Sequence, residues 1–247
     1  DISQVSKYIN KYKNEKIVIK CGGKVLIDPN LFDNFIEDIS VLYKLGLKVI
    51  IIHGGGPRIK EELAKLNIES EFINGLRVTN KQTMEGVEKA LVDFNIEIIK
   101  KLEKKNCKSE GLNVSTNNVI IVDQENKNIG FVGKPRKVFN EKINIVIDKN
   151  VIPVLSPMGK GDDDQKYKIN ADPAAAAVAK SLKSRRLLLM TDVEGVYDEN
   201  KKLINEIKPS EAQNLINKKI VQGGMIPKLL NSIDAIENGV RGVVIID

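Results

Sequence analysis

The sequence predicts an α/β fold, a three-layer α/β/α sandwich with a central, mainly parallel sheet. Two observations lead to this prediction. Short and nearly unbroken runs of Ile, Val and Leu recur along the chain, as strands buried on both faces of a parallel sheet require. Segments with helical spacing of apolar residues lie between these runs, and such alternation is typical of a sheet covered by helices on both faces.

The apolar runs are the predicted strands of the sheet. They lie at residues 17–19, 47–52, 151–155, 187–190 and 243–246. Two further regions predict hairpins, because turn-forming residues interrupt strand-like segments. The first hairpin is expected at 72–78 with Asn74-Gly75 in its turn, and the second at 119–138 with 126–128 in its turn.

Helices are expected between the strands. They are predicted at residues 31–42, 57–66, 80–105, 171–182, 209–217 and 225–237. Pro57 stands at the favoured first-turn position of its helix, and Gly46 and Gly239 stand where a helix is expected to end. We expect two lobes, 1–150 and 151–247.

Composition excludes several classes of protein. The 247 residues are 42% hydrophobic, yet no apolar run approaches the roughly 20 residues that span a bilayer, so we expect no membrane partner. Cys21 and Cys107 show no paired spacing, which indicates a reduced, cytoplasmic setting. The net charge of +6 comes from lysines interleaved with acids, and aromatic residues are few. This pattern favours small anionic substrates over nucleic acid.

Glycines follow two of the predicted strands, where ligands of parallel sheets bind. Lys20 precedes Gly22-Gly23, and His53 precedes Gly54-Gly55-Gly56. Such turns let backbone amides approach an anion with no Cβ in the way, although each alone is also compatible with a tight turn. Neither a P-loop nor a dinucleotide-binding fingerprint is present. We interpret the single histidine, His53, as a hydrogen-bonded structural residue without a catalytic role.

Four polar positions lie outside the glycine turns. Lys228 falls in the first turn of a predicted helix, where a cation opposes the helix dipole and calls for an anionic partner. Asn170 and Asp172 open another helix, where such residues are most often caps. Arg77 follows a hairpin turn and can bind a carboxylate with two hydrogen bonds. We interpret the acidic run 162–164 as a solvated loop and expect no metal held by the protein.

These motifs together resemble the amino acid kinase family. Lys-x-Gly-Gly, His-Gly-Gly-Gly-Pro, Asn-Gly-Leu-Arg-Val-Thr, Asn-Ala-Asp and Gly-Gly-Met-Ile-Pro-Lys stand in the order seen in that family, over nearly the whole chain. The second of the two lobes would then bind ATP. Within the family, the chain is similar to members that act on N-acetyl-L-glutamate. The resemblance implies ATP-dependent phosphorylation of the side-chain carboxylate of N-acetyl-L-glutamate to the acyl phosphate, the second step of arginine biosynthesis. It also implies Mg²⁺ brought with ATP and a homo-oligomer, a dimer or a hexamer.

The resemblance also implies roles for single residues. Lys20 and Lys228 match two lysines that stabilise the transition state, and Asp172 matches a carboxylate that orients them. Arg77 would hold the α-carboxylate of the substrate. The remaining substrate-binding positions are Gly55, Gly56 and Asn170. The remaining phosphate- and nucleotide-binding positions are Gly22, Gly23, Gly54, Thr191, Asp192, Gly195, Val196 and Tyr197.

Some positions depart from the family's pattern. Lys168 stands where these kinases usually carry an Asn that contacts the substrate, so a kinase for a related acylated amino acid of the aminoadipate type stays an alternative. Lys24 is an extra cation beside the first glycine turn. The chain stops at Asp247 where relatives continue, so feedback inhibition by arginine is not assumed. A further alternative is a non-catalytic amino-acid-binding regulatory protein.

The N-terminal stretch is similar to the extra helix of hexameric, arginine-sensitive relatives. Its apolar positions have helical spacing: Val5, Tyr8, Ile9 and Tyr12. A helix packed on its own domain is the alternative.

Overall fold

The structure is a computed structural model that describes residues 2–247. Within the N-terminal helix, the side chains of Ile2, Ser3, Val5 and Tyr8 lie outside the description, so the predicted packing face of that helix stays a prediction. The helices are α1 (Ile2–Tyr12), α2 (Pro29–Lys44), α3 (Gly56–Lys65), α4 (Lys81–Lys104), α5 (Asn140–Asp148), α6 (Ala171–Leu182), α7 (Pro209–Asn217) and α8 (Met225–Glu237), with 3-10 turns η1 (Gly23–Leu26) and η2 (Lys127–Ile129). The strands are β1 (Lys16–Cys21), β2 (Lys48–His53), β3 (Phe72–Ile73), β4 (Leu76–Arg77), β5 (Ser109–Leu112), β6 (Ile120–Gln124), β7 (Val132–Val138), β8 (Ile152–Leu155), β9 (Met158–Lys160), β10 (Lys166–Ile169), β11 (Arg186–Met190) and β12 (Val243–Ile246).

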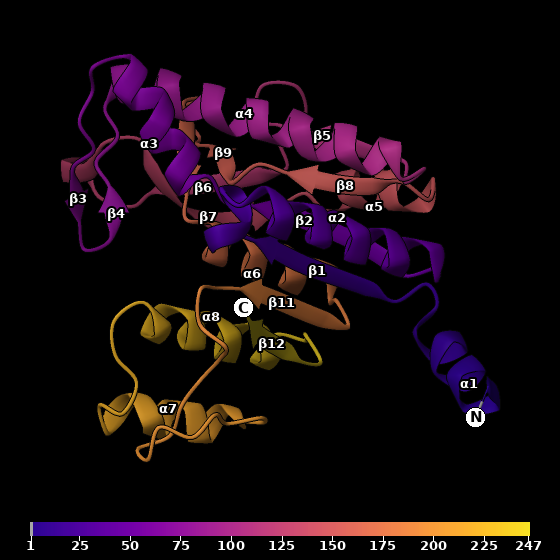
Figure 1. The fold of residues 1–247 in the computed structure, drawn as a ribbon. Helices are drawn as coiled ribbons and strands as arrows, with labels where there is room; N and C mark the ends of the chain where they lie inside the picture. The colour runs from indigo at the N-terminus through magenta and orange to yellow at the C-terminus, as the bar shows by residue number, and fades with distance from the viewer. Residues whose placement is uncertain (1) are drawn as a thin grey trace.

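The central sheet has six strands in the order β12-β11-β1-β2-β8-β5 (Figure 1). Every neighbouring pair in this sheet is parallel. The carboxyl ends of all six strands therefore meet along one edge. Since β1 lies between β2 and β11, the segments that follow these three strands come together there, although they are far apart in the sequence.

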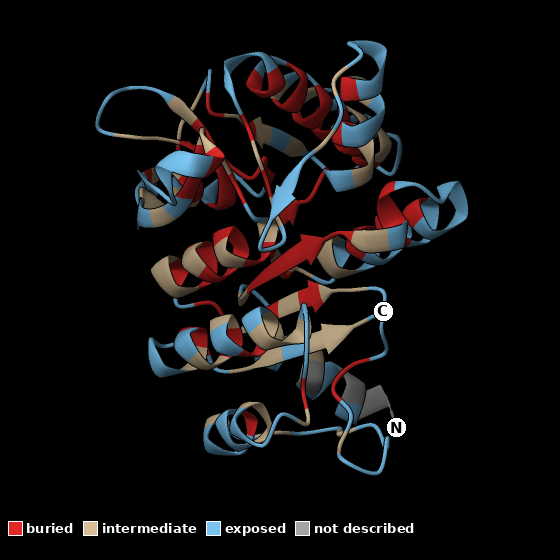
Figure 2. Ribbon diagram, turned by 90° about the vertical axis from the view of Figure 1, so that its left-hand side faces the viewer, coloured by how far each residue is buried: buried red, intermediate tan, exposed pale blue. Residues whose placement is uncertain are grey.

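Both faces of the sheet are buried, as the unbroken apolar runs predict. In β1, Ile17 and Ile19 pack in a core with α2 and α4, whereas Val18 packs in a core with α5, α6 and α8. Helices therefore lie on both faces, and the predicted three-layer sandwich is confirmed. Figure 2 shows the buried residues concentrated in the central strands and on the sides of the helices that face them.

The face of helix α6 that packs on the sheet is made of small residues. Ala174, Ala175, Ala176 and Ala179 are all buried in the core that contains Val18. A short alanine side chain lets the helix backbone approach the strands. The first turn of α6 lies at the carboxyl end of β1, where Asp172 contacts Lys20.

The remaining strands form two small structures beside the sheet. Strands β6, β7, β9 and β10 close into a four-stranded barrel. Strands β3 and β4 form an antiparallel hairpin with Asn74 and Gly75 at its turn, both at positive φ. Both predicted hairpins are confirmed, since β6 and β7 also pair antiparallel.

The sequence prediction missed four elements, β5, β9, β10 and α5. The strands have three or four residues each, too few for a periodic signal, and Gly111 and Gly159 interrupt their apolar pattern. Helix α5 begins after Phe139, whose side chain makes no cap hydrogen bond. Among the helices of residues 2–247, none combines the length and apolar composition needed to cross a bilayer.

Candidate active site

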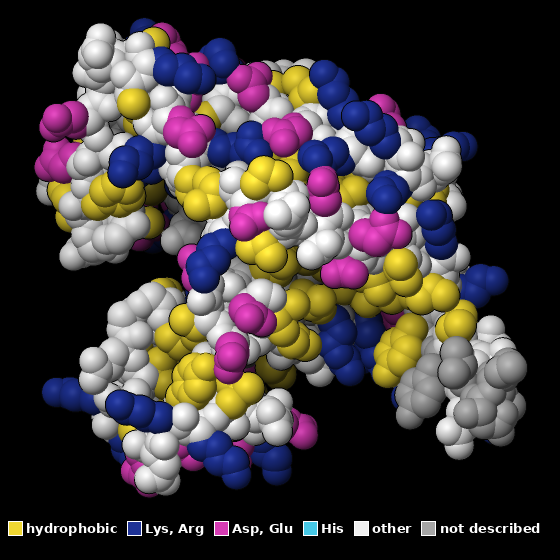
Figure 3. Space-filling view, viewed as in Figure 1, with side chains coloured by type: hydrophobic (Ala, Val, Ile, Leu, Met, Phe, Trp, Pro, Cys, Tyr) yellow, Lys and Arg dark blue, Asp and Glu magenta, His cyan; other side chains and the backbone are white. Residues whose placement is uncertain are grey.

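The candidate site lies where the first two strands end. Lys20 is the second-last residue of β1, and its backbone neighbour Cys21 accepts a hydrogen bond from the Gly54 backbone N–H at 2.8 Å. The turns after β1 and β2 are thus joined directly. Figure 3 shows the molecular surface hollowed between the region of the β3–β4 hairpin and that of α7 and α8.

Three charged side chains from remote parts of the chain meet at this point. The Nζ atom of Lys20 lies 3.1 Å from Oδ1 of Asp172, and Nζ of Lys228 donates a hydrogen bond to Oδ2 of the same carboxylate. The Lys20 ammonium also donates to the carbonyl oxygen of Met190, at the end of β11, at 3.2 Å. The two lysines therefore lie on opposite oxygens of one aspartate, with a net charge of +1.

The environment keeps Asp172 ionised. Burial raises the pKa of the Asp172 carboxyl, but the nearby charges of Lys20 and Lys228 outweigh burial and hold the pKa below its ordinary value. Asp172 also lies in the first turn of α6, where the helix dipole favours an anion, and Asn170 caps this helix by accepting the Asp172 backbone N–H at 3.1 Å. Lys228 lies in the first turn of α8 and finds in Asp172 the anionic partner that this position requires.

The first glycine turn needs glycine for steric reasons. A Cβ on Gly22 would clash with the Lys20 ammonium, because it would lie 2.5 Å from Nζ. Gly23 has φ +63°, in the left-handed region, and a Cβ there would meet the Asp192 carboxylate. That carboxylate accepts the backbone N–H of Lys24 at 2.8 Å, which fixes the turn against the segment that follows β11.

The second glycine turn opens α3. Gly55 is the N-cap of this helix, and a Cβ on Gly55 would clash with Leu91, whereas a Cβ on Gly56 would stand in open space. The free backbone N–H groups at the start of α3 give this turn a partial positive charge. Such a turn suits an anionic ligand.

Both turns line a cavity of about 270 Å³. The charged side chains lining it are all cations: Lys20, Arg77 and Lys168. The predicted positions that line it are Lys20, Gly22, Gly23, Gly54, Gly55, Gly56, Arg77 and Asn170. The fold therefore places these eight predicted residues around one cavity. Asp172 and Lys228 are not in its lining, but Asp172 contacts both Lys20 and Lys228.

Arg77 is held in place by neutral groups only. Its guanidinium donates hydrogen bonds to the Ser70 hydroxyl and, at 3.2 Å, to the carbonyl oxygen of Gly56, and it lies over the Phe72 ring at 4.7 Å. Burial lowers the pKa of Arg77. Since none of these three partners is an acid, the charge of Arg77 is free to bind an anion in the cavity.

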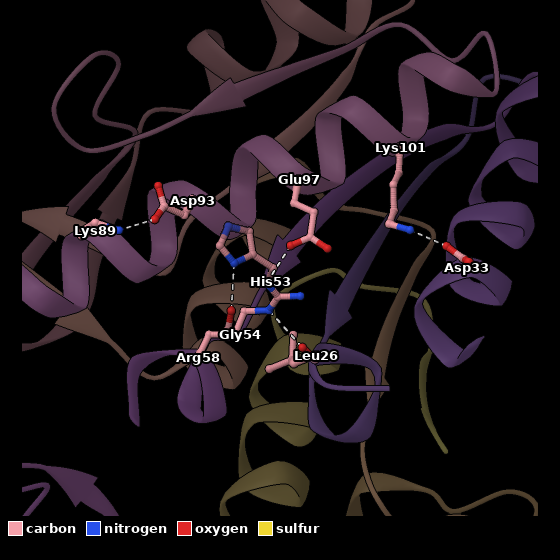
Figure 4. A network of polar contacts seen from close by, with 9 residues as sticks. All are labelled: Leu26, Asp33, His53, Gly54, Arg58, Lys89, Asp93, Glu97 and Lys101. Atoms are coloured by element: carbon pink, nitrogen blue, oxygen red, sulfur yellow. Dashed lines mark hydrogen bonds and ion pairs between the residues drawn. The ribbon is translucent and has the colours of Figure 1, made fainter. Parts of the chain in front are cut away.

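A polar network behind the glycine turns fixes their position (Figure 4). His53 is fully buried; its Nδ1–H donates to the Gly54 carbonyl at 2.8 Å, and its Nε2 accepts from Asn95 at 3.1 Å. Burial lowers the pKa of His53 to about 4, so the ring is neutral. Arg58 donates to the Leu26 carbonyl at 3.0 Å and pairs with Glu97. These contacts agree with a structural role for His53.

Sequence reasoning did not identify the contributions of Arg58, Asn95 and Ser70. Arg58 and Asn95 sit on helices α3 and α4, and no short motif links them to the turns that they support. Ser70 lies in a segment without secondary structure. Their roles follow from packing between elements, which one sequence does not reveal.

The predicted nucleotide residues lie on the other side of the cluster. Thr191 donates its backbone N–H to Ile246 at 2.7 Å, and the Tyr197 hydroxyl donates to Glu194 at 3.0 Å. Gly195 and Val196 line a second cavity of about 520 Å³ between the segment 203–209 and α8. The structure therefore places these five predicted positions in one stretch after β11, next to the first glycine turn through Asp192.

The acidic run 162–164 has other partners. Asp162 pairs with Arg136 at 2.5 Å, Asp163 accepts from the Tyr167 hydroxyl at 2.8 Å, and Asp164 pairs with Lys160 at 2.8 Å. Within residues 2–247, no three His, Cys, Asp or Glu side chains gather as a metal site.

Comparisons with known proteins agree with the motifs. The model of the amino acid kinase family matches residues 15–247. A protein named acetylglutamate kinase from Pelagibacter ubique is 50% identical over 246 residues, which covers 100% of this chain and 85% of that protein. A crystal structure from Streptococcus mutans UA159 has 31% identity and a TM-score of 0.83, with 94% of each chain covered.

A structure of N-acetylglutamate synthase from Neisseria gonorrhoeae, complexed with coenzyme A and N-acetyl-glutamate, has a TM-score of 0.87 at 20% identity. This chain spans 57% of the length of that synthase, and the likeness concerns the fold alone. The family model matches residues 15–247, and the relative at 50% identity is matched over the whole of this chain. This chain belongs to the amino acid kinase family.

Proposed function

We propose that this chain transfers the γ-phosphoryl group of ATP to the side-chain carboxylate of N-acetyl-L-glutamate and so forms the acyl phosphate, the second step of arginine biosynthesis. The relative at 50% identity that carries the name acetylglutamate kinase supports this substrate. The observation that supports the chemistry most directly is the contact of Lys20 and Lys228 with one carboxylate, beside two glycine turns.

The reaction requires no general base. A carboxylate nucleophile is ionised at neutral pH, because its pKa is near 4. The lone histidine is neutral, buried and fully hydrogen-bonded, in agreement with a reaction that needs no proton acceptor. The work left to the protein is to hold the reactants in line and to neutralise the charge on the moving phosphoryl group.

The residues around the cavity divide this work. Lys20 and Lys228 stabilise the equatorial oxygens of the phosphoryl group, and Asp172 orients both ammonium groups. The amides of Gly22, Gly23, Gly55 and Gly56 bind the phosphoryl group or the accepting carboxylate, and the Gly54 amide, which donates to the Cys21 carbonyl, holds the second turn beside the first. Arg77 binds the α-carboxylate, and Asn170 contacts the substrate from the cavity wall.

The residues of the site fit ATP with its magnesium ion. The Thr191–Tyr197 segment would hold base and ribose, and the glycine turns would hold the phosphates. Asp172 and Asp192, the acidic side chains beside the turns, already have partners, so Mg²⁺ fits best as an ion carried by phosphate oxygens and water. When bound, Mg²⁺ neutralises phosphate charge.

Three broader features belong to the same proposal. Residues 1–150 supply most of the acyl-amino-acid site, to which Asn170 is added from the second lobe, and residues 151–247 supply the nucleotide site. The protein works in the cytoplasm, in keeping with its two free, buried cysteines. It forms at least a dimer, and a monomer in size-exclusion chromatography with light scattering would refute that.

Trapping the acyl phosphate as a hydroxamate tests the function. With ATP and Mg²⁺, we expect product from N-acetyl-L-glutamate and much less from N-acetyl-L-2-aminoadipate, whose side chain is one methylene longer. A higher kcat/KM for the longer acid would overturn the substrate assignment. Binding of acetylglutamate without any acyl phosphate would overturn the activity and would indicate a regulatory binding protein.

A further inference from the structure

We propose that His53 is a positioning residue, which aims the backbone N–H of Gly55 into the substrate cavity by holding the Gly54 carbonyl on the opposite side. The inference rests on the proposed function, because the Gly55 N–H is one of the donors assigned there to the phosphoryl group or the accepting carboxylate. It extends that function to a ring of four hydrogen-bonded side chains, none of which lines the cavity.

The hydrogen bond of His53 fixes one peptide plane of the second glycine turn. The Nδ1–H of His53 donates to the Gly54 carbonyl oxygen at 2.8 Å, as Figure 4 shows. The Gly54–Gly55 peptide bond is planar and trans, so its carbonyl and its N–H point in opposite directions. His53 is fully buried and lies outside the cavity lining, whereas Gly55 lines the cavity. A carbonyl held toward the imidazole therefore directs the N–H of Gly55 toward the cavity.

The neighbouring polar groups of the turn already have partners. The Gly54 N–H donates to the Cys21 carbonyl at 2.8 Å, and the Gly56 carbonyl accepts from Arg77 at 3.2 Å. Within residues 2–247, no group accepts a hydrogen bond from the Gly55 N–H. This donor is therefore left for a ligand. A donor whose direction is fixed before the ligand binds stabilises developing charge without reorganisation.

Three further side chains close a ring of hydrogen bonds with His53. Nδ2 of Asn95 donates to Nε2 of His53 at 3.1 Å, and Oδ1 of Asn95 accepts from Nδ2 of Asn113 at 3.5 Å. The Ser156 hydroxyl donates to Oδ1 of Asn113 at 2.5 Å, and its oxygen lies 3.4 Å from Nε2 of His53. His53, Asn95 and Ser156 are buried, so water does not compete for these bonds.

The directions of these bonds leave His53 one tautomer. Nδ2 of Asn95 also donates to the Val154 carbonyl at 3.0 Å, which fixes the orientation of the Asn95 amide. Nε2 of His53 must then accept, and we assign the ring proton to Nδ1, where it meets the Gly54 carbonyl. A proton on Nε2 would face an N–H of Asn95 and would leave the carbonyl without its donor. Asn95 thus sets the proton that His53 donates.

The ring also joins the carboxyl ends of three neighbouring strands. His53 is the last residue of β2, and Asn113 and Ser156 directly follow β5 and β8, which lie next to it in the sheet order β2-β8-β5. Gly111 of β5 leaves room for the ring, since a Cβ there would lie 2.4 Å from Oδ1 of Asn95. The peptide plane in the glycine turn is therefore fixed against the edge of the sheet.

Two substitutions at one position separate aiming from support. His53→Asn places an amide nitrogen at the level of Nδ1 and can still donate to Gly54, whereas His53→Gln places its amide at the level of Nε2, where it meets Asn95. Both remove a buried ring, so both should lower stability. At a temperature where all variants are folded, we expect kcat in the hydroxamate assay to fall about 100-fold for His53→Gln and less than about 10-fold for His53→Asn, with the KM for ATP unchanged.

The peptide itself can be observed by NMR without turnover. Protein labelled with glycine that carries ¹³C at the carbonyl and ¹⁵N at the amide gives HNCO signals only from Gly–Gly bonds, which the sequence has at 22–23, 54–55, 55–56 and 223–224. The carbonyl shift of Gly54 reports the hydrogen bond from residue 53. We expect this shift to be kept in His53→Asn and to move upfield in His53→Gln, in the protein without ligand. On addition of AMPPNP, Mg²⁺ and acetylglutamate, the Gly55 amide proton should move downfield in the wild type and in His53→Asn but not in His53→Gln.

Two other variants serve as controls. Leu102 is fully buried on α4, the helix that carries Asn95, and lies outside the ring. Leu102→Ala leaves a cavity and lowers stability, but kcat and the Gly54 carbonyl signal should be unchanged. Ser156→Ala removes only one hydroxyl of the ring, and kcat should fall about 3- to 10-fold with a smaller upfield move of the same signal.

Three results would overturn the inference: an equal kcat in the two His53 variants, the same loss of kcat in Leu102→Ala, or a Gly54 carbonyl signal that does not move in His53→Gln. If neither His53 variant folds, an unchanged kcat and an unchanged signal in Ser156→Ala would overturn it. Absence of acyl phosphate with the wild type would instead refute the proposed function. The carbonyl signals of the proteins without ligand would then decide on the positioning role of His53.

Discussion

Lys228→Met tests the central element of the proposed mechanism. The substitution removes one of two ammonium groups on Asp172 and changes the charge of the cluster from +1 to 0, while Lys20 stays 3.1 Å from the same carboxylate. The side chain of Lys228 is only 14% exposed, so its charge acts in a poorly solvated place. Removing one such stabilising donor typically lowers kcat by about 10²–10³, or about 2.7–4 kcal/mol of transition-state stabilisation.

The loss should appear in kcat and not in binding. Lys228 does not line the cavity that contains Arg77, so the KM for acetylglutamate should change less than about 2-fold. Asp172 keeps one partner, so the free energy of unfolding should fall by less than about 2 kcal/mol, below the cost of leaving a buried charge unpaired.

The control is Lys180→Met, since Lys180 on α6 pairs with Asp234 on α8 at 2.5 Å. It breaks another α6–α8 ion pair away from the cluster, and kcat should be unchanged. The hydroxamate assay gives kcat, and chemical denaturation gives stability. A kcat within about 3-fold of the wild type for Lys228→Met, or an equal loss in Lys180→Met, would refute the reasoning.

Three other changes have distinct expected outcomes. Arg77→Ala should raise the KM for acetylglutamate about 10- to 100-fold and leave the KM for ATP unchanged in steady-state assays, since Arg77 offers an unpaired guanidinium to the cavity. Asp172→Asn should lower both kcat and the denaturation midpoint, with a stability loss of about 3–5 kcal/mol, because two ammonium groups lose their shared counter-charge. The pKa of His53, lowered to about 4 by burial, lies below its ordinary value of 6.5. The unfolded chain therefore binds a proton that the folded chain does not, and the free energy of unfolding should fall by up to about 3 kcal/mol between pH 7 and 4 in urea titrations. His53→Gln should lose that part of the pH dependence.

The parts of the fold that the sequence predicts are those with a strong periodic signal. Helices α6, α7 and α8 begin and end where the capping and turn residues predict. Each predicted apolar run forms a strand of the parallel sheet. Strands β9 and β10 have no such signal, since β10 reads Lys-Tyr-Lys-Ile over four residues. Their existence depends on pairing with β6 and β7 in a closed barrel, a long-range contact that no local pattern encodes.

The same distinction holds for the site. The glycine turns and Lys20 could be located because ligands of parallel sheets bind beyond the carboxyl ends of the strands. Lys228 could be singled out because a cation in a first helical turn needs a counter-charge, and the structure shows Asp172 as that charge. The network of Arg58, Glu97, Asn95 and His53 was not predictable, because it joins two helices and a strand end through packing alone.

The distribution of charge connects the fold to the proposed reaction. Lys20, Asp172 and Lys228 together carry one excess positive charge, and Arg77 and Lys168 have no acid partner within residues 2–247. The proposed substrate carries two carboxylates, of which one accepts a phosphoryl group that is itself anionic. One carboxylate suits Arg77, and the excess charge of the cluster suits the phosphoryl group. Stability alone does not explain an excess of positive charge at two separate positions, because cations that are buried or partly buried without an acid partner destabilise a folded chain. It is what a protein needs if it must bring two mutually repelling anions into contact.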